Sequence, residues 1–472
     1  MVENLVKEIV MDYISTRGNI APVGFVDAVL MGLADDGGLL VPKHIPQLSE
    51  AELEAWRGLS YPELALELFS RFVDGEIPRA DLKRLVDDSY GTFRDEAVTP
   101  VRRIHDCLHV LELFHGPTFA FKDIALQFLG NLYGYISKKN GSTIHILGAT
   151  SGDTGASAIE GVRGKEGIRI CILHPHGKVS RVQELQMTTV DDANVLNLAV
   201  DGNFDDCQRI IKELFADVAF KQRYHLRAIN SINIARILAQ TVYYFYAYFR
   251  LAEQGVRASV NFSVPTGNFG DIFAGYLAKR MGLPIHKLML ATNENNILER
   301  FVTEGVYQPG EFRGTHSPSM DIQVASNFER YLYYLNGENP RAVAALMDAF
   351  KRDGRITVEG DALRQVQADF AAYGVGNDEC LREIKDCYDE YGYLLDPHTA
   401  CGVAAANRLS ADGEVTVALS TAHPAKFDEA IRLVDIVQTA PAQIAALSDK
   451  PQFQTRVAGT NEAVAEQLER FF

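Results

Sequence analysis

The sequence predicts an α/β fold in which helices cover parallel β-sheets. Between about residues 100 and 234, short apolar segments alternate with helical segments, a rhythm typical of parallel strands joined by helical crossovers. Two apolar segments of the chain run into glycine-rich turns and then into helices. With 472 residues and 47% hydrophobic content, the chain is longer than a single core supports, so we expect two or three domains.

The first hundred residues are predicted to form an extension or cap, because short helical segments alternate there with glycine and proline turns. Residues 63–72 (ELALELFSRF) carry the apolar face of a helix. The segment YISTRG places Ser15, Thr16 and Arg17 on a loop, for which composition favours a structural turn.

The next part of the chain is predicted to alternate helix and strand. After its second strand, Lys178, Ser180 and Arg181 open a helix. A solvated helix start is the favoured interpretation there, and contact with an anion is the alternative. The expected elements are a helix over residues 122–136 and strands over 143–147 (TIHIL), 168–173 and 195–200.

The remainder of the chain repeats this pattern. Residues 230–236 (NSINIAR) begin a tyrosine-rich helix, and residues 311–327 read as a polar loop that lines a cleft or lies on the surface. Asp396 precedes a proline as a helix N-cap. Ligands of open parallel sheets bind at the carboxyl ends of strands, so Thr421, which follows the last strand, is well placed beside a ligand. The expected elements are strands over 258–264, 286–292 and 415–419 and a helix over 271–281.

One lysine stands out for its surroundings. The stretch LFHGPTFAFKD sets Lys122 among Pro117, Phe119 and Phe121, with Gly116 permitting a tight turn. Apolar neighbours weaken the solvation of an ammonium, so the pKa of Lys122 should fall below its usual ~10.4 and leave a nucleophilic neutral amine. A surface lysine at the start of an amphipathic helix is the alternative for such a residue taken alone.

Two glycine-rich turns change that assessment. The backbone N–H groups of GATSGDTG (residues 148–155) and of PTGNFG (residues 265–270) open toward an anion at the start of a helix. Either turn alone is more often there for backbone geometry. Together with an activated lysine they suit a phosphate-bearing aldehyde held as a Schiff base, which is pyridoxal phosphate, and a second site for an amino-acid carboxylate.

Composition narrows the partners and the compartment. A formal charge of -16 disfavours nucleic acid and anionic membranes as partners. The six cysteines show no C-x-x-C spacing, and the N-terminus lacks the basic-then-apolar order of a signal peptide, so a cytoplasmic location is expected. The longest aromatic run, residues 242–249, is far shorter than a membrane span.

Several motifs, in this order, resemble the threonine synthase family: DYISTRG, GLADDGGLLVP, HGPTFAFKD, GATSGDTGAS, PTGNFGDIFAGY, LDPHTACG and LSTAHPAKF. The resemblance covers about residues 13–427. It implies two doubly wound parallel-sheet domains of the tryptophan-synthase-β-like type (fold type II), with the cofactor between them and an N-terminal extension. The approximate divisions are 1–100 for the extension, 101–235 for the smaller domain and 236–472 for the larger.

The same resemblance implies roles for individual residues. Lys122 would carry pyridoxal phosphate and shuttle protons, and Thr421 would hydrogen-bond the pyridine nitrogen. The substrate would be O-phospho-L-homoserine, converted with water to L-threonine and phosphate by a monomer or homodimer. The residues expected at the cofactor phosphate are Gly267, Asn268, Phe269, Gly270 and Asp271. Those expected at the substrate are Thr150, Ser151, Gly152, Asp153, Thr154, Lys178, Ser180 and Arg236.

Three alternatives stay open. A dehydratase or cysteine-synthase-like enzyme on the same fold would need no second phosphate site. An inactive threonine-synthase-like binding protein would keep the cofactor loop without all the groups around it. A nucleotide-dependent transferase would require a G-K-[ST] sequence, which the glycine-rich turns lack.

Overall fold

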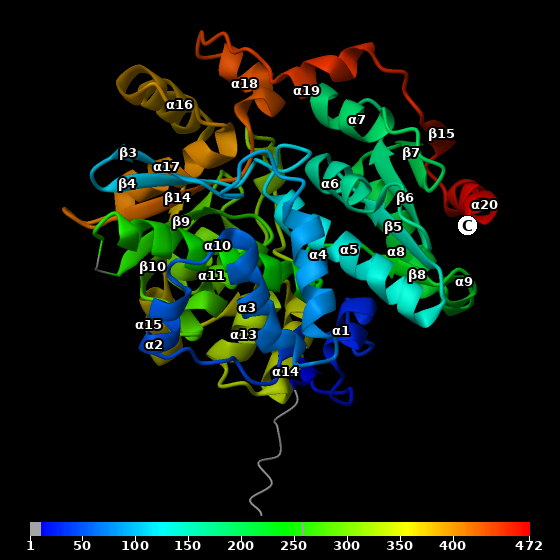
Figure 1. Cartoon of the computed structure of the whole chain (residues 1–472), viewed down its shortest axis with the longest axis horizontal. Helices are drawn as coiled ribbons and strands as arrows, with labels where there is room; N and C mark the ends of the chain where they lie inside the picture. Colours follow the sequence, from blue (N-terminus) through cyan, green and yellow to red (C-terminus); the bar gives the residue numbers. More distant parts are fainter. Residues whose placement is uncertain (1–10, 257–258) are drawn as a thin grey trace, which may run out of the picture.

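Two sheets lie side by side in the computed structural model, which describes residues 11–256 and 259–472 (Figure 1). The larger sheet has six strands in the order β13-β10-β9-β14-β4-β3, and the smaller has five in the order β15-β7-β6-β5-β8. All neighbours are parallel except β3 and β4. The strands of the larger sheet are β3 (Val101–His105), β4 (Leu108–Glu112), β9 (Val260–Pro265), β10 (Ile285–Thr292), β13 (Phe370–Gly374) and β14 (Thr416–Ser420). Those of the smaller sheet are β5 (Ile144–Ala149), β6 (Ile168–Pro175), β7 (Val195–Asp201), β8 (Leu226–Ala228) and β15 (Thr455–Ala458).

The predicted α/β class and parallel sheets are confirmed, and the predicted strands coincide with β5, β6, β7, β9, β10 and β14 apart from shifts at their ends. The start predicted at residue 258 lies outside the described residues. The sheets do not follow the predicted divisions at every strand. β3 and β4, assigned to the smaller domain, pair within the larger sheet, and β15, assigned to the larger domain, pairs with β7 in the smaller one. Because these pairings join strands far apart in sequence, local patterns could not reveal them.

The N-terminal extension consists of a two-stranded sheet and four helices. β1 (Tyr13–Ser15) pairs antiparallel with β2 (Leu40–Pro42), so the YISTRG segment is partly a strand rather than only a loop. Capping boxes start two of the helices, with Ser49 at one and Ser60 at the other. The helices are α1 (Phe25–Met31), α2 (Glu50–Trp56), α3 (Tyr61–Val73) and α4 (Arg79–Tyr90).

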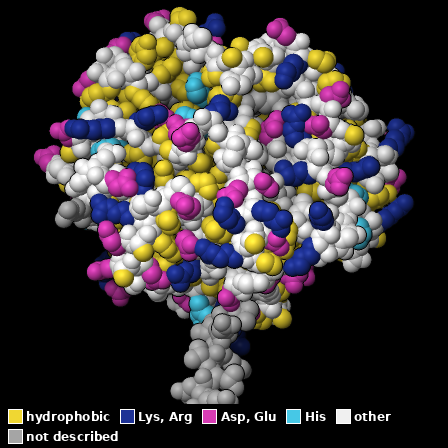
Figure 2. All heavy atoms as spheres, viewed as in Figure 1, with side chains coloured by type: hydrophobic (Ala, Val, Ile, Leu, Met, Phe, Trp, Pro, Cys, Tyr) yellow, Lys and Arg dark blue, Asp and Glu magenta, His cyan; other side chains and the backbone are white. Residues whose placement is uncertain are grey.

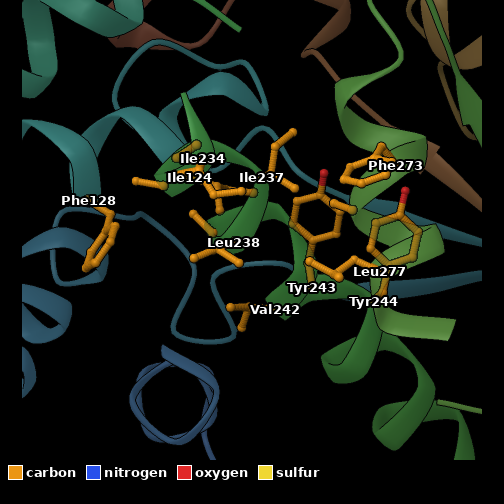
Figure 3. Packing of buried hydrophobic residues seen from close by; sticks show 14 of the residues in the cluster. Ile124, Phe128, Ile234, Ile237, Leu238, Val242, Tyr243, Tyr244, Phe273 and Leu277 are labelled. Carbon is orange, nitrogen blue, oxygen red and sulfur yellow. The ribbon is translucent and has the colours of Figure 1, made fainter. Parts of the chain in front are cut away.

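The main core forms around the long helix α10 (Ile234–Glu253), which is apolar on nearly every side and is buried along most of its length. Figure 3 shows its side chains between Ile124 and Phe128 of α5 (Lys122–Asn140) and Phe273 and Leu277 of α11 (Gly270–Arg280). Both flanking helices begin at predicted site motifs. The helix therefore fixes the lysine segment and the PTGNFG turn relative to one another.

The remaining helices lie against the two sheets or form the C-terminal part of the chain (Figure 1). On the face drawn in Figure 2, acidic and basic side chains alternate without a large patch of one sign. No helix among the described residues combines the length and apolar character of a membrane span. The helices not yet named are α6 (Asp153–Val162), α7 (Arg181–Thr188), α8 (Phe204–Ala216), α9 (Val218–Arg223), α12 (Ile297–Glu304), α13 (Phe328–Leu335), α14 (Pro340–Asp353), α15 (Gly360–Asp369), α16 (Asn377–Tyr391), α17 (Pro397–Leu409), α18 (Asp428–Arg432), α19 (Ala442–Ala445) and α20 (Asn461–Phe471). A two-stranded sheet of β11 (Val306–Tyr307) and β12 (Ile356–Thr357) completes the fold.

Candidate active site

The turn before Lys122 is held by a buried carboxylate. Asp123 accepts hydrogen bonds from the backbone N–H of Thr118 at 2.7 Å and from its hydroxyl at 2.6 Å. Gly116 makes room for this contact, because a Cβ there would come within 2.4 Å of the Asp123 Cβ. The turn thus delivers Lys122 as the first residue of α5, on the wall of a cavity.

The amine of Lys122 lies in a mostly buried environment, with its side chain 12% exposed. Its Nζ is 3.5 Å from Asp153 Oδ2 and 5.0 Å from the centre of the Phe121 ring. Burial lowers the pKa of Lys122, and the positive charges of Lys426 and Arg236 add to this effect against the opposing charge of Asp153. The predicted direction of the shift is confirmed. Of the three expected apolar neighbours, Phe121 shares the cavity wall with Lys122, whereas Pro117 and Phe119 do not line it, and nearby cations add to the effect of burial.

Lys426 is a residue that sequence reasoning missed. Its side chain is fully buried, and its Nζ lies 2.7 Å from Asp153 Oδ1 and 2.8 Å from the carbonyl oxygen of Thr118. Burial alone would raise the pKa of Asp153, but Lys426 and Lys122 outweigh it and hold that pKa well below its usual range. The signal in the sequence was a second lysine between apolar residues, in HPAKF, just after a strand.

The TSGDT turn contributes two of its five predicted residues to the cavity wall, Asp153 and Thr154. Thr150 is buried, and its hydroxyl accepts the N–H groups of Gly152 and Gly155, each at 2.9 Å. Ser151 is exposed. The Thr150 hydroxyl therefore shapes the turn, and the predicted contact of this turn with a substrate carboxylate stays a prediction.

The PTGNFG turn follows β9 and lines the same cavity. Among the described residues, none of the backbone N–H groups of residues 267–271 donates a hydrogen bond to another part of the chain. We call these five residues the cradle. A glycine is favoured at position 267 because a Cβ there would lie 3.0 Å from the Met320 Cα and the Ser319 carbonyl oxygen. The reason is lack of space and not backbone conformation, since neither Gly267 nor Gly270 has a positive φ. Free N–H groups at the start of α11 suit a phosphate.

Arg236 reaches this cavity from the first turn of α10. Its guanidinium is buried, and Nε and Nη1 have no hydrogen-bond partner among the described residues. Burial lowers the pKa of Arg236 to about 10, so the group stays charged at neutral pH. A buried cation with free donors requires an anion, and this adds to the fit of the cavity to phosphate groups.

The side chain of Asp271 binds two tyrosines, although Asp271 is predicted to contact the cofactor phosphate. Its Oδ1 accepts the hydroxyl of Tyr243 at 2.5 Å and that of Tyr244 at 2.8 Å. Burial raises the pKa of Asp271 to about 6, although both hydroxyls oppose the shift. Only the backbone N–H of Asp271 is free to meet a phosphate, since a carboxylate would repel it.

Three further residues line the cavity from distant parts of the chain: Ser319, His398 and Thr421. His398 Nδ1 lies 2.9 Å from Asp396 Oδ1, and its Nε2 accepts the N–H of Ser319 at 3.2 Å, so both ring nitrogens are held in place by neighbours. The predicted N-cap at Asp396 is confirmed. The loop over residues 311–327 therefore does line a cleft. Thr421 follows β14, at the carboxyl end of that strand as expected.

Two predicted residues lie apart from the cavity. Lys178 and Ser180 are exposed, and Ser180 caps α7 through its contact with the N–H of Gln183. The link to the site is indirect, because the Gln183 Nε2 donates to Asp153 Oδ1 at 2.8 Å. A role of Lys178 and Ser180 in substrate binding stays a prediction.

Comparison with known proteins gives consistent results along the chain. The family model for the threonine synthase N terminus matches residues 12–90, that for pyridoxal-phosphate-dependent enzymes matches 94–421, and that for the threonine synthase C-terminal region matches 399–468. Threonine synthase of Schizosaccharomyces pombe is 48% identical over 457 residues, covering 90% of this chain and 89% of the relative. That of Pseudomonas aeruginosa is 49% identical and covers 93% of each chain. The crystal structure of pyridoxal-phosphate-bound threonine synthase from Brucella melitensis superposes with a TM-score of 0.95 at 44% identity, covering 98% of this chain and 99% of that one.

Proposed function

The chain belongs to the threonine synthase family of pyridoxal-phosphate-dependent enzymes, and from this premise we propose that it converts O-phospho-L-homoserine and water to L-threonine and phosphate. The observation that carries the proposal is one cavity with a buried amine of lowered pKa, together with five N–H groups and an arginine that have no partner in the part of the chain that the structure describes. The amine suits an aldehyde, and the other two groups suit the phosphates of cofactor and substrate.

The cofactor, when bound, supplies an aldehyde for amines and an electron-accepting ring. We assign its phosphate to the N–H groups of the cradle and its ring nitrogen to the hydroxyl of Thr421. A hydroxyl in that place, rather than a carboxylate, leaves the ring nitrogen largely unprotonated and the ring a milder electron acceptor. Lys122 is the amine that takes the aldehyde.

The amine of Lys122 is proposed to move protons at Cα and Cβ of the substrate. Lys426 supports this role. Its positive charge lowers the pKa of Lys122 and so offsets part of the opposite effect of Asp153, with which it is paired. The single amine is flexible enough to serve successive carbons, because lysine carries four rotatable bonds beyond its Cα.

The substrate has two anionic ends. We assign its carboxylate to the TSGDT turn, where the Asp153 and Thr154 N–H groups open α6 at the cavity wall. We assign its phosphate to Arg236, the buried guanidinium with two donors to spare. A dehydratase on this fold acts on a substrate without a phosphate and would not require a cation such as Arg236 at this position.

Turnover in heavy-oxygen water tests this function. Elimination of phosphate followed by addition of water at Cβ places the label in the threonine hydroxyl and leaves the released phosphate unlabelled, since the C–O bond breaks. In deuterated water, deuterium should appear at Cγ and at Cα. Labelled phosphate, homoserine as product, or a threonine methyl group without deuterium would contradict the proposal.

We further propose that the enzyme works in the cytoplasm as a monomer or homodimer. All six cysteines are free thiols, five of them buried, which suits a reducing compartment.

A further inference from the structure

Arg330 is a fully buried arginine behind the cradle. Its guanidinium donates to three oxygens from three parts of the chain: the carbonyl of Leu40 at 3.0 Å, the carbonyl of Ile232 and the side-chain oxygen of Asn327. Burial lowers its pKa to about 9, so the group is charged at neutral pH and must keep these acceptors. A rigid, planar donor fork fixes three segments at one point.

The third of these segments holds the cradle. The backbone N–H and the side-chain amide of Asn327 both donate to the carbonyl oxygen of Asn268, at 3.0 and 3.1 Å. In a trans peptide the carbonyl and the following N–H point in opposite directions, so this tie orients the Phe269 N–H away from Asn327. Gly270 leaves room for the tie, because a Cβ there would lie 3.1 Å from Asn327 Nδ2.

The first segment belongs to the N-terminal extension, and a second contact strengthens its hold. Glu329, next to Arg330, accepts the hydroxyl of Thr16 at 2.6 Å and binds Arg17 through two N–H groups at 3.0 and 2.8 Å. The same hydroxyl accepts the N–H of Leu39 at 2.9 Å. Two neighbouring residues at the start of α13 are therefore bound by the extension: the YISTRG segment binds Glu329, and β2 binds Arg330.

We propose that Arg330 is a positioning residue through which the N-terminal extension orients the phosphate cradle. No residue of the extension between 11 and 100, the part that the structure describes, lies on the cavity wall. The extension nevertheless fixes Glu329 and Arg330, which fix Asn327 and through it Asn268. The inference rests on the proposed function, since it takes the cradle as the cofactor's phosphate site. Its consequence is that damage to this contact weakens binding of the phosphate specifically.

Apo-enzyme titrated with pyridoxal phosphate and with pyridoxal separates the phosphate contribution from that of the rest of the cofactor. Arg330→Lys keeps the charge but removes the three-way fork, so its affinity for pyridoxal phosphate should fall roughly tenfold while its affinity for pyridoxal stays unchanged. Inorganic phosphate should also compete less well in this variant. Arg250→Lys is the matched control, because Arg250 ties the extension to α10 through the Arg57 carbonyl, away from the cradle.

Equal losses for both aldehydes, or no loss, would overturn the proposal. If Arg330→Lys does not fold, Arg17→Met and Glu329→Gln decide, since the ion pair of these two residues ties the extension to the same segment of α13. They should show the same phosphate-specific loss to a smaller extent, and its absence from both would overturn the proposal. A wild-type enzyme that binds pyridoxal as tightly as pyridoxal phosphate would instead refute the cradle assignment itself.

Discussion

Replacing Lys426 by methionine should raise the pKa of Lys122. The two ammonium groups contact opposite oxygens of the Asp153 carboxylate, at 2.7 and 3.5 Å, so they lie within ~8 Å of one another. Two unit charges at ~8 Å and an effective dielectric constant of ~20 repel by about 2 kcal/mol, or about 1.5 pKa units. Without Lys426, that repulsion disappears and Asp153 is left to stabilise the Lys122 ammonium alone.

The assay follows the reaction of the apo-enzyme amine with pyridoxal across a pH series. The midpoint for Lys426→Met should move upward by about 1.5 pH units, which leaves roughly thirtyfold less neutral amine at pH 7. Lys426→Arg keeps the cation and should stay near the wild-type midpoint. Circular dichroism must show that the methionine variant is folded, since breaking a buried ion pair costs about 3–5 kcal/mol. A folded variant with an unchanged midpoint would refute the role of Lys426.

Three further outcomes are expected. Borohydride reduction of the holoenzyme and peptide mapping should recover the pyridoxyl group on Lys122; recovery on another lysine would contradict the assignment. Gly270→Val should weaken binding of pyridoxal phosphate with the fold retained, because its Cβ crowds Asn327, whereas Gly314→Ala, with no atom nearby, should change neither when both are titrated. The pKa of Asp271 is about 6 in the folded protein, against ~3.9 in the unfolded chain. Between these values the folded state binds a proton that the unfolded state has lost. The free energy of unfolding therefore falls by roughly 3 kcal/mol as the pH rises from about 4 to above 6. Urea unfolding of the apo-protein at pH 4.5 and 7 should show this loss reduced in Asp271→Asn, and an equal loss would count against it.

What the sequence predicted correctly was local. The environment of Lys122, the glycine-rich turn of the cradle and the end of the strand before Thr421 are each readable within about ten consecutive residues, because strand, turn and helix signals are short-ranged. The parallel sheets follow from the same alternation.

What the sequence left out depends on partners far apart in the chain. Lys426 contacts Asp153 at a sequence separation of 273 residues, and Arg330 contacts Leu40 at a separation of 290. The direction of the Asp271 side chain is set by two tyrosines of α10, not by its own turn. Local composition carries no information on these contacts, since a buried charge is identified only by the fold that buries it.

The strand order of the two sheets has a consequence for synthesis of the chain. β14, which lies between β9 and β4, is synthesised only at residues 416–420, and β15, which completes the smaller sheet, only at residues 455–458. Until then β4 and β7 each present an unpaired edge, the kind of surface that joins with other chains. Neither sheet can be complete before these late strands are made, so the strands synthesised earlier depend on residues 416–458 for their missing neighbours.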